Sequence, residues 1–296
     1  MKQTFGIKRI LFATDFLESS RLALDYAVAF AHRFRATLVF LHAVELPPSA
    51  EAAELVTARA SLSRQAAEER LKAFAAGVRR TGIEVDILIK DGTPCQVVLA
   101  AVKEVAPDLL ILGVHGVHRG LGHLLIGSNT EKILLSVSCP TLSVGAHVLA
   151  GIDLQLNLSE ILYCSDFTPQ AAASAPFALW LGSEFNVPVE VCHLAPTPLE
   201  NDADIAYKTA ELYCDELKRD APEIAESWCT PAFQLRHGLT LDQIVTRAEA
   251  ETAGLIVLGV HPDSQFGRHL HTSFAYQLLT KAVCPVLTIG SKDHHD

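Results

Sequence analysis

The feature that most constrains this chain is an internal repeat. Five short blocks of the first half recur in the same order in the second half: RILFATDF and EILYCSDF, TLVFLHAV and VEVCHLAP, IKDGTPCQVV and LRHGLTLDQIV, LLILGVHG and LIVLGVHP, SCPTLSV and VCPVLTI. The 296 residues suffice for two domains of about 150 residues, each with a core of its own. We therefore expect two copies of one domain, at residues 1–147 and 158–291.

Strand and helix signals alternate within each half. Short runs of Ile, Leu and Val are separated by longer segments of helical character, such as Ser19–Phe34. This alternation predicts an α/β fold, in which each half forms a parallel sheet of about five strands with helices on both faces. Runs such as LLILGV are apolar without alternation, as strands buried on both faces are. TLSVGAH and VLTIGSK are predicted edge strands that pair with each other, so the two halves should form a pseudo-dimer.

Charge and cysteine content narrow the function classes. The formal charge is −10 and the 24 Lys and Arg residues are scattered, so a basic surface for nucleic acid or an anionic membrane is not expected. Seven cysteines without a close-spaced pair indicate reduced thiols, and the first residues lack the apolar core of a signal peptide. We expect a cytoplasmic protein with no nucleic-acid or membrane partner.

A candidate phosphate site follows the strand LLILG. Gly113 and Gly116 give a backbone without side chains, and after the loop HRGLGH a helix begins at GSNTEKIL. Ser128 is its predicted N-cap, with Glu131 at the capping-box spacing. Helix N-termini preceded by glycine bind phosphate through free N–H groups. The alternative is that the glycines only end a strand and start a helix.

The blocks ILFATDF, LVFLHAV and LLILGVHG…LIGSNTEKIL…CPTLSV together resemble the universal stress protein family, and the duplicated chain resembles its tandem-domain members. The resemblance covers nearly the whole chain and implies two Rossmann-like domains of the adenine nucleotide alpha hydrolase type. Members that bind ATP use the pattern G-x2-G-x9-G-[S/T]. Here it falls on Gly113, Gly116, Gly127 and Ser128, with Asn129 next, but ten residues instead of nine separate Gly116 from Gly127.

The same resemblance implies a nucleoside site at the ends of the first two strands. Asp15 would face the ribose, Thr14 and Ala13 would line the nucleoside, and the backbone of Ala43 would meet adenine. A helix cap is the alternative role for Asp15 and for its counterpart Asp166.

The second half departs from the nucleotide pattern. Pro262 and Thr272 stand where the pattern has its second and third glycines, whereas Gly259 and Ser273 remain. Proline fixes φ and supplies no N–H, and threonine adds a branched side chain where phosphate needs backbone. The sequence therefore predicts ATP, accompanied by Mg²⁺, in the first domain only.

The remaining polar residues predict no further chemistry. His42 and His193 end matching strands, where a histidine with satisfied hydrogen bonds is expected. Two groups of loop histidines match no common zinc spacing, so no metal ligand is assigned among His115, His118, His123, His261, His269 and His271. For these histidines, exposure to solvent and contact with phosphate are the alternatives. No residue is assigned as catalytic, because no general base or electrophile is identifiable.

The expected function is that of an ATP-binding stress-response protein, a nucleotide-responsive regulator that hydrolyses ATP slowly if at all. Two alternatives stay open: an interaction module that binds no nucleotide, and a slow ATPase of the same fold. Dimerisation of the tandem chain is a further hypothesis.

Overall fold

The computed structural model describes residues 5–45, 53–114, 116–119, 123–126, 128–148, 156, 158–165, 174–194, 235–250, 254–260 and 274–290. In the first half, the sheet strands are β1 (Arg9–Ala13), β2 (Thr37–Val44), β3 (Val85–Asp91), β4 (Leu109–Gly113) and β7 (Thr141–Val144). The helices of this half are α1 (Glu18–Phe34), α2 (Ala53–Arg79), α3 (Pro94–Val105) and α4 (Ser128–Ser136).

The second half repeats this plan. Its strands are β8 (Ile161–Ser165), β9 (Val189–Leu194), β10 (Leu235–Leu239), β11 (Leu255–Val260) and β12 (Val286–Gly290). Its described helices are α6 (Ala175–Phe185), α9 (Leu241–Ala250) and α10 (Phe274–Lys281).

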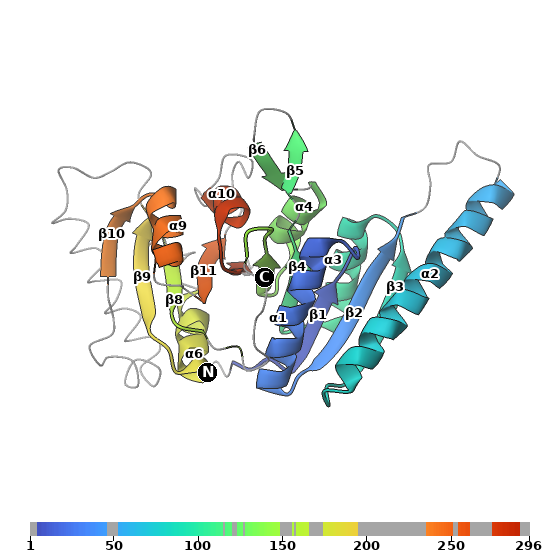
Figure 1. Ribbon diagram of the computed structural model, residues 1–296, viewed down its shortest axis with the longest axis horizontal. Coiled ribbons are helices and arrows are strands. Elements are labelled where there is room, and N and C mark those ends of the chain that lie inside the picture. Colours follow the sequence, from blue (N-terminus) through green and yellow to red (C-terminus); the bar gives the residue numbers. More distant parts are fainter. Residues whose placement is uncertain are drawn as a thin grey trace, which may run out of the picture.

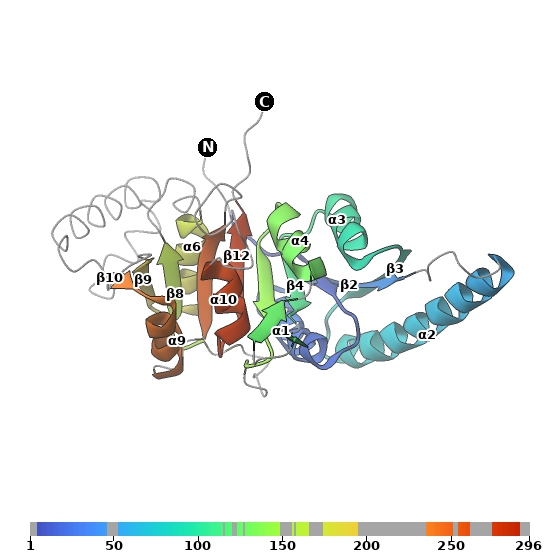
Figure 2. The ribbon, with the colours of Figure 1, turned by 90° about the horizontal axis from the view of Figure 1, so that it is seen from above.

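All ten of these strands form one sheet, in the order β10-β9-β8-β11-β12-β7-β4-β1-β2-β3 (Figure 1). Neighbours within each half are parallel, and helices cover both faces, as Figure 2 shows from above. The predicted fold class of two α/β domains, each with five parallel strands, is confirmed.

Each face of the sheet carries a core that runs through both halves. On one face, Phe12 and Ile111 pack under α1 and α2; on the other, Leu11 and Leu110 pack under α3 and α4. All four side chains are at most 1% exposed. Burial on both faces explains why LLILG reads as a continuous apolar run instead of an alternating one.

The two halves meet at the only antiparallel pair among the ladders of the large sheet that the structure describes, β7 with β12. Leu142 lies opposite Leu287, its counterpart in the repeat, as a pseudo-two-fold axis between the halves requires. The Thr288 hydroxyl donates to the Thr141 carbonyl oxygen at 3.3 Å across the same junction. The predicted pairing of TLSVGAH with VLTIGSK is thus confirmed, and the architecture is that of an internal pseudo-dimer.

An aromatic cluster reinforces the junction on the α1 face. Phe34 at the end of α1 lies 5.5 Å from the Trp180 ring and 5.8 Å from the Phe185 ring, both on α6. Arg33 adds a cation over the Phe185 ring at 5.5 Å. Such edge and tilted aromatic contacts stabilise beyond their buried area, so the halves are held by packing as well as by the sheet.

One element differs from the sequence-based expectation. The segment expected to be a loop between Gly113 and the α4 helix contains an antiparallel hairpin of β5 (Gly116–Arg119) and β6 (His123–Ile126). The hairpin rises beyond the sheet, and β6 contacts α10 of the second half (Figure 1). Four-residue strands with few β-formers give little sequence signal.

No helix in the described ranges has the length and apolarity that crossing a membrane needs.

Candidate functional site

The carboxyl ends of β1, β2 and β4 meet at one edge of the first half. Ala13 lies opposite Leu41 of β2 on one side and Leu112 of β4 on the other. After β1 the chain enters α1 on one face of the sheet, and after β4 it enters α4 on the opposite face. The strand order therefore reverses between β1 and β4, which is a topological switch point. In open parallel sheets, ligands bind outside the carboxyl ends at such a point.

Five predicted site residues gather at this edge. They are Ala13 and Ala43, both half-buried on their strands, Thr14, Asp15, and Gly113 at the end of β4. Ala43 lies two residues beyond Leu41, the β1 partner of Ala13, and therefore toward the same edge as Thr14 and Asp15. The strand register thus brings together residues that the sequence separates widely.

Asp15 is held by hydrogen bonds from the start of α1. Its Oδ1 accepts the Leu17 N–H at 2.9 Å and the Ser20 hydroxyl at 2.6 Å. The alternative prediction that Asp15 is the helix N-cap is wrong in position: α1 begins at Glu18, Leu17 is the cap residue, and Asp15 precedes it by two. The aspartate forms an Asx turn instead, because its short side chain reaches the N–H two residues on.

Ser20 is a site residue that sequence reasoning missed. It is 3% exposed, donates to Asp15 Oδ1, and lies within 3.4 Å of the Asp15 backbone nitrogen. Ser20 lies five positions after Asp15, in the first turn of α1, and this spacing alone does not distinguish it from the neighbouring Ser19. Ser20 fixes the orientation of the carboxylate at the exposed edge.

Gly113 is required by packing between α1 and β4. A Cβ at this position would lie 2.5 Å from the Ser19 carbonyl carbon and 2.5 Å from the Ser20 nitrogen. Both are backbone atoms, so no side-chain rotation could relieve the contact. The glycine therefore lets the first turn of α1 lie directly against the end of β4, which brings Asp15 and Ser20 to the edge.

The remaining predicted residues belong to the segment after β4. Gly116 opens β5 opposite Ile126, and α4 begins at Ser128 with Asn129 half-exposed in its first turn. Gly127 lies outside the described residues. Ser128 is the first residue of α4 instead of the N-cap that the sequence predicted, and its side chain is not described. In Figure 1 the start of α4 lies beside the hairpin, at the same edge as the end of β4.

His42 is satisfied in the way the sequence suggested. Its Nδ1 lies 2.8 Å from the Thr14 carbonyl oxygen, and its ring packs at 4.5 Å against Phe16. Thr14 is anchored further, because its N–H donates to the Leu41 carbonyl and its hydroxyl accepts the Phe16 N–H. His42 thus fixes the loop after β1.

Most of the corresponding edge of the second half cannot be compared. Asp166, Pro262, Thr272 and Ser273 lie outside the described residues, as do the side chains of the loop histidines and His193. Gly259 is described and lies in β11 opposite Ile289. Within the described ranges, no group of three or more His, Cys, Asp or Glu side chains is placed to hold a metal ion.

Comparison with known proteins agrees with this architecture. The universal stress protein family model matches residues 6–145 and again 158–290. A universal stress protein of Thermus aquaticus is 30% identical over 138 residues, which is 46% of this chain and 98% of that protein. One from Methanocaldococcus jannaschii is 26% identical over 142 residues, 46% of this chain and 81% of that protein.

Solved structures share the fold over the whole chain. A universal stress protein from Archaeoglobus fulgidus superimposes with a TM-score of 0.72 at 16% identity, covering 98% of both chains. A structure from Pseudomonas aeruginosa, described as a putative universal stress protein, gives 0.64 at 17% identity, covering 96% of this chain and 93% of that one. With both halves matched by the family model, the chain belongs to the universal stress protein family as a tandem two-domain member.

Proposed function

We propose that the first domain, residues 1–147, binds ATP with Mg²⁺ and that the protein acts as a nucleotide-responsive regulator in the cytoplasm. The observation that supports this most is the convergence of three strand ends and the start of α4 at one switch point. The nucleoside would lie against Ala13, Thr14, Asp15 and Ala43, and the phosphates against the backbone of Gly113, Gly116, Gly127, Ser128 and Asn129.

The residues present fit an adenine nucleotide. Asp15 is exposed at the edge and is oriented by Ser20 and the Leu17 N–H, so its carboxylate is suited to accept hydrogen bonds from the ribose hydroxyls. The N-terminus of α4 offers backbone N–H groups and the positive end of a helix dipole to phosphate. When bound, ATP would supply a triphosphate that carries Mg²⁺. Its adenine ring would contact the β2 backbone at Ala43.

The structure also limits what each glycine contributes. The missing Cβ of Gly113 faces the backbone of Ser19 and Ser20, which is a packing role whether or not nucleotide binds. Gly116 and Asn129 are therefore the positions at which we test phosphate binding. In the second domain Pro262 takes the place of Gly116, which supports one nucleotide per chain.

The test is a calorimetric titration of the nucleotide-stripped full chain with Mg-ATP. We expect one site, lost in Gly116→Pro and weakened about tenfold or more in Asn129→Asp, since the added carboxylate repels phosphate. The same charge at a helix N-terminus favours α4, so Asn129→Asp should keep or raise the melting temperature.

The matched control is Gln96→Glu in the first turn of α3, where Thr93 already donates to Gln96 Oε1 at 2.9 Å. It adds the same charge at another helix start and should leave ATP affinity unchanged. Absence of binding to the unaltered chain would overturn the proposal in favour of an interaction module. Two sites would refute the restriction to the first domain, and sustained hydrolysis would identify an ATPase.

A further inference from the structure

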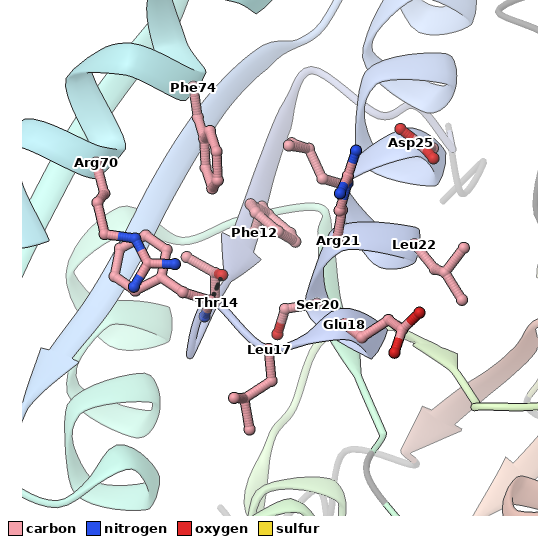
Figure 3. Close-up of a pocket in the computed structure, with 12 residues that line it drawn as sticks. Phe12, Thr14, Leu17, Glu18, Ser20, Arg21, Leu22, Asp25, Arg70 and Phe74 are labelled. Atoms are coloured by element: carbon pink, nitrogen blue, oxygen red, sulfur yellow. Dashed lines mark hydrogen bonds between the residues drawn. The ribbon is translucent and has the colours of Figure 1, made fainter.

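We propose that a groove between α1 and α2 in the first domain binds a small amphipathic anion, a molecule with a flat apolar body and one acidic head group. This α1–α2 groove is distinct from the proposed nucleotide site, although both include Thr14 and Ser20. Figure 3 shows it with its lining side chains.

The groove has the size and the shape of a ligand site. Its volume is about 820 Å³, within the range of about 300–1,000 Å³ typical of small-molecule pockets. Phe12 of β1, 1% exposed overall, lies between α1 and Phe74 of α2, and Leu24 of α1 also lines the groove. Phe74 stays 36% exposed.

Phe16 completes the aromatic lining from the loop after β1. Its ring lies 6.0 Å from Phe74 and 4.5 Å from His42. The residue has φ +63°, a left-handed conformation that is strained for residues other than glycine. The contacts with His42 and Phe74 accompany this strained backbone and place the ring in the lining of the groove.

Two cations border the groove from opposite helices. The Arg70 guanidinium of α2 lies 4.2 Å from the Phe16 ring centroid, and Arg21 extends from α1 beside Phe12. Among the described residues, neither arginine forms an ion pair with a carboxylate. Asp25 is the acidic neighbour of Arg21, and burial raises the pKa of its carboxyl while Arg21 opposes that shift. In Figure 3, Asp25 and Glu18 lie on the side of Phe12 away from Arg70.

This arrangement selects the occupant by chemistry. Aromatic faces in the lining favour a flat apolar body, since rings gain most from stacked or edge contacts. The Arg70 guanidinium lies over the Phe16 ring and retains donors for a carboxylate or sulfonate. A groove with a cation on an aromatic ring therefore suits an aromatic or acyl anion better than a neutral or cationic molecule.

The test uses 8-anilinonaphthalene-1-sulfonate, an aromatic sulfonate whose fluorescence rises in apolar surroundings, with the folded full-length chain. We expect saturable binding that Arg70→Gln weakens at least fivefold and Phe74→Ala at least threefold. Matched controls lie on the same helix outside the groove: Lys72→Gln removes an exposed charge, and Leu62→Ala removes an exposed apolar side chain, 66% exposed. Both controls should bind as the unaltered chain does.

A second measurement isolates the charge. Naphthalene-2-carboxylate should displace the probe from the unaltered chain better than naphthalene-2-methanol, and Arg70→Gln should remove that preference. Equal binding by all four variants, or a preference that Arg70→Gln leaves intact, would overturn the proposal. Because all four positions are exposed, melting temperatures close to that of the unaltered chain are expected and show that a lost signal reflects the groove.

Discussion

Replacing Gly113 with alanine should destabilise the first domain, although the change adds only one methyl group. The new Cβ would lie 2.5 Å from two backbone atoms of α1 and 2.7 Å from the Ser19 carbonyl oxygen. Real contacts at these distances do not occur, so the first turn of α1 must move away from β4. Overpacking of this kind costs about 1–3 kcal/mol, and a shift of backbone rather than side chain places the expected loss near 2–3 kcal/mol.

The same substitution at Gly77 is the matched control. Gly77 is exposed in the interior of α2, and an added Cβ meets nothing within 4 Å. There the methyl group should stabilise the chain by about 0.5–1 kcal/mol, because glycine is a poor helix former. The same substitution should therefore lower the free energy of unfolding at Gly113 and raise it at Gly77.

The assay is urea denaturation followed by circular dichroism, with melting temperature as a second readout. A loss of 2–3 kcal/mol corresponds to a fall in melting temperature of roughly 4–12 °C for a domain of about 150 residues. A Gly113→Ala protein as stable as the unaltered chain would refute the packing argument and leave ligand approach as the reason for the glycine. The reasoning would fail equally if Gly77→Ala were the more damaging change.

Three further predictions concern the aspartate turn, the junction and a buried thiol. Asp15→Ala should lower the free energy of unfolding by about 1–2 kcal/mol, because the buried Ser20 hydroxyl and the Leu17 N–H lose their acceptor. Asp15→Asn keeps an Oδ1 and should cost less than half as much. Equal losses in urea denaturation would contradict the hydrogen-bond assignment. Phe34→Ala should cost about 2 kcal/mol and shift Trp180 fluorescence to longer wavelength by exposing the α1–α6 contact, and an unchanged emission spectrum would argue against that contact. Burial raises the pKa of the Cys284 thiol from near 9 to about 12, so its contribution to stability is complete below pH 9 and is lost between pH 9 and pH 12, where only the unfolded chain releases the proton. The decline approaches about 1.4 kcal/mol per pH unit for this group, and Cys284→Ala should make the alkaline decline in stability shallower; an identical pH profile would count against the shift.

Much of this fold was predictable because its signals are local. The runs LLILG and LIVLG are apolar within a few residues, and burial of β4 and β11 on both sheet faces is what such runs predict. The internal repeat predicted two domains, and the edge strands TLSVGAH and VLTIGSK indicated how the two halves would pair. Pairing of Leu142 with Leu287 confirmed that expectation.

The candidate site was predictable only in part. Ala13, Thr14, Asp15, Ala43 and Gly113 do gather at one edge, because parallel strands end together, but their role toward a nucleotide stays a prediction. Ser20 and the β5–β6 hairpin were missed. A serine inside a helix and a four-residue strand carry no local pattern that separates them from their neighbours.

What the sequence by itself determined was the plan of the large sheet: alternating strands and helices, strands buried on both faces, and the occurrence of that plan twice. Only the tertiary structure decided which surfaces touch. The reason for Gly113 lies in the backbone of Ser19 and Ser20, and the α1–α2 groove exists because Phe12, Phe16 and Phe74 come from three separate elements. Hydrophobic pattern is a property of neighbouring residues, whereas close approach and cavities depend on distances between segments far apart in the chain, which no local pattern specifies.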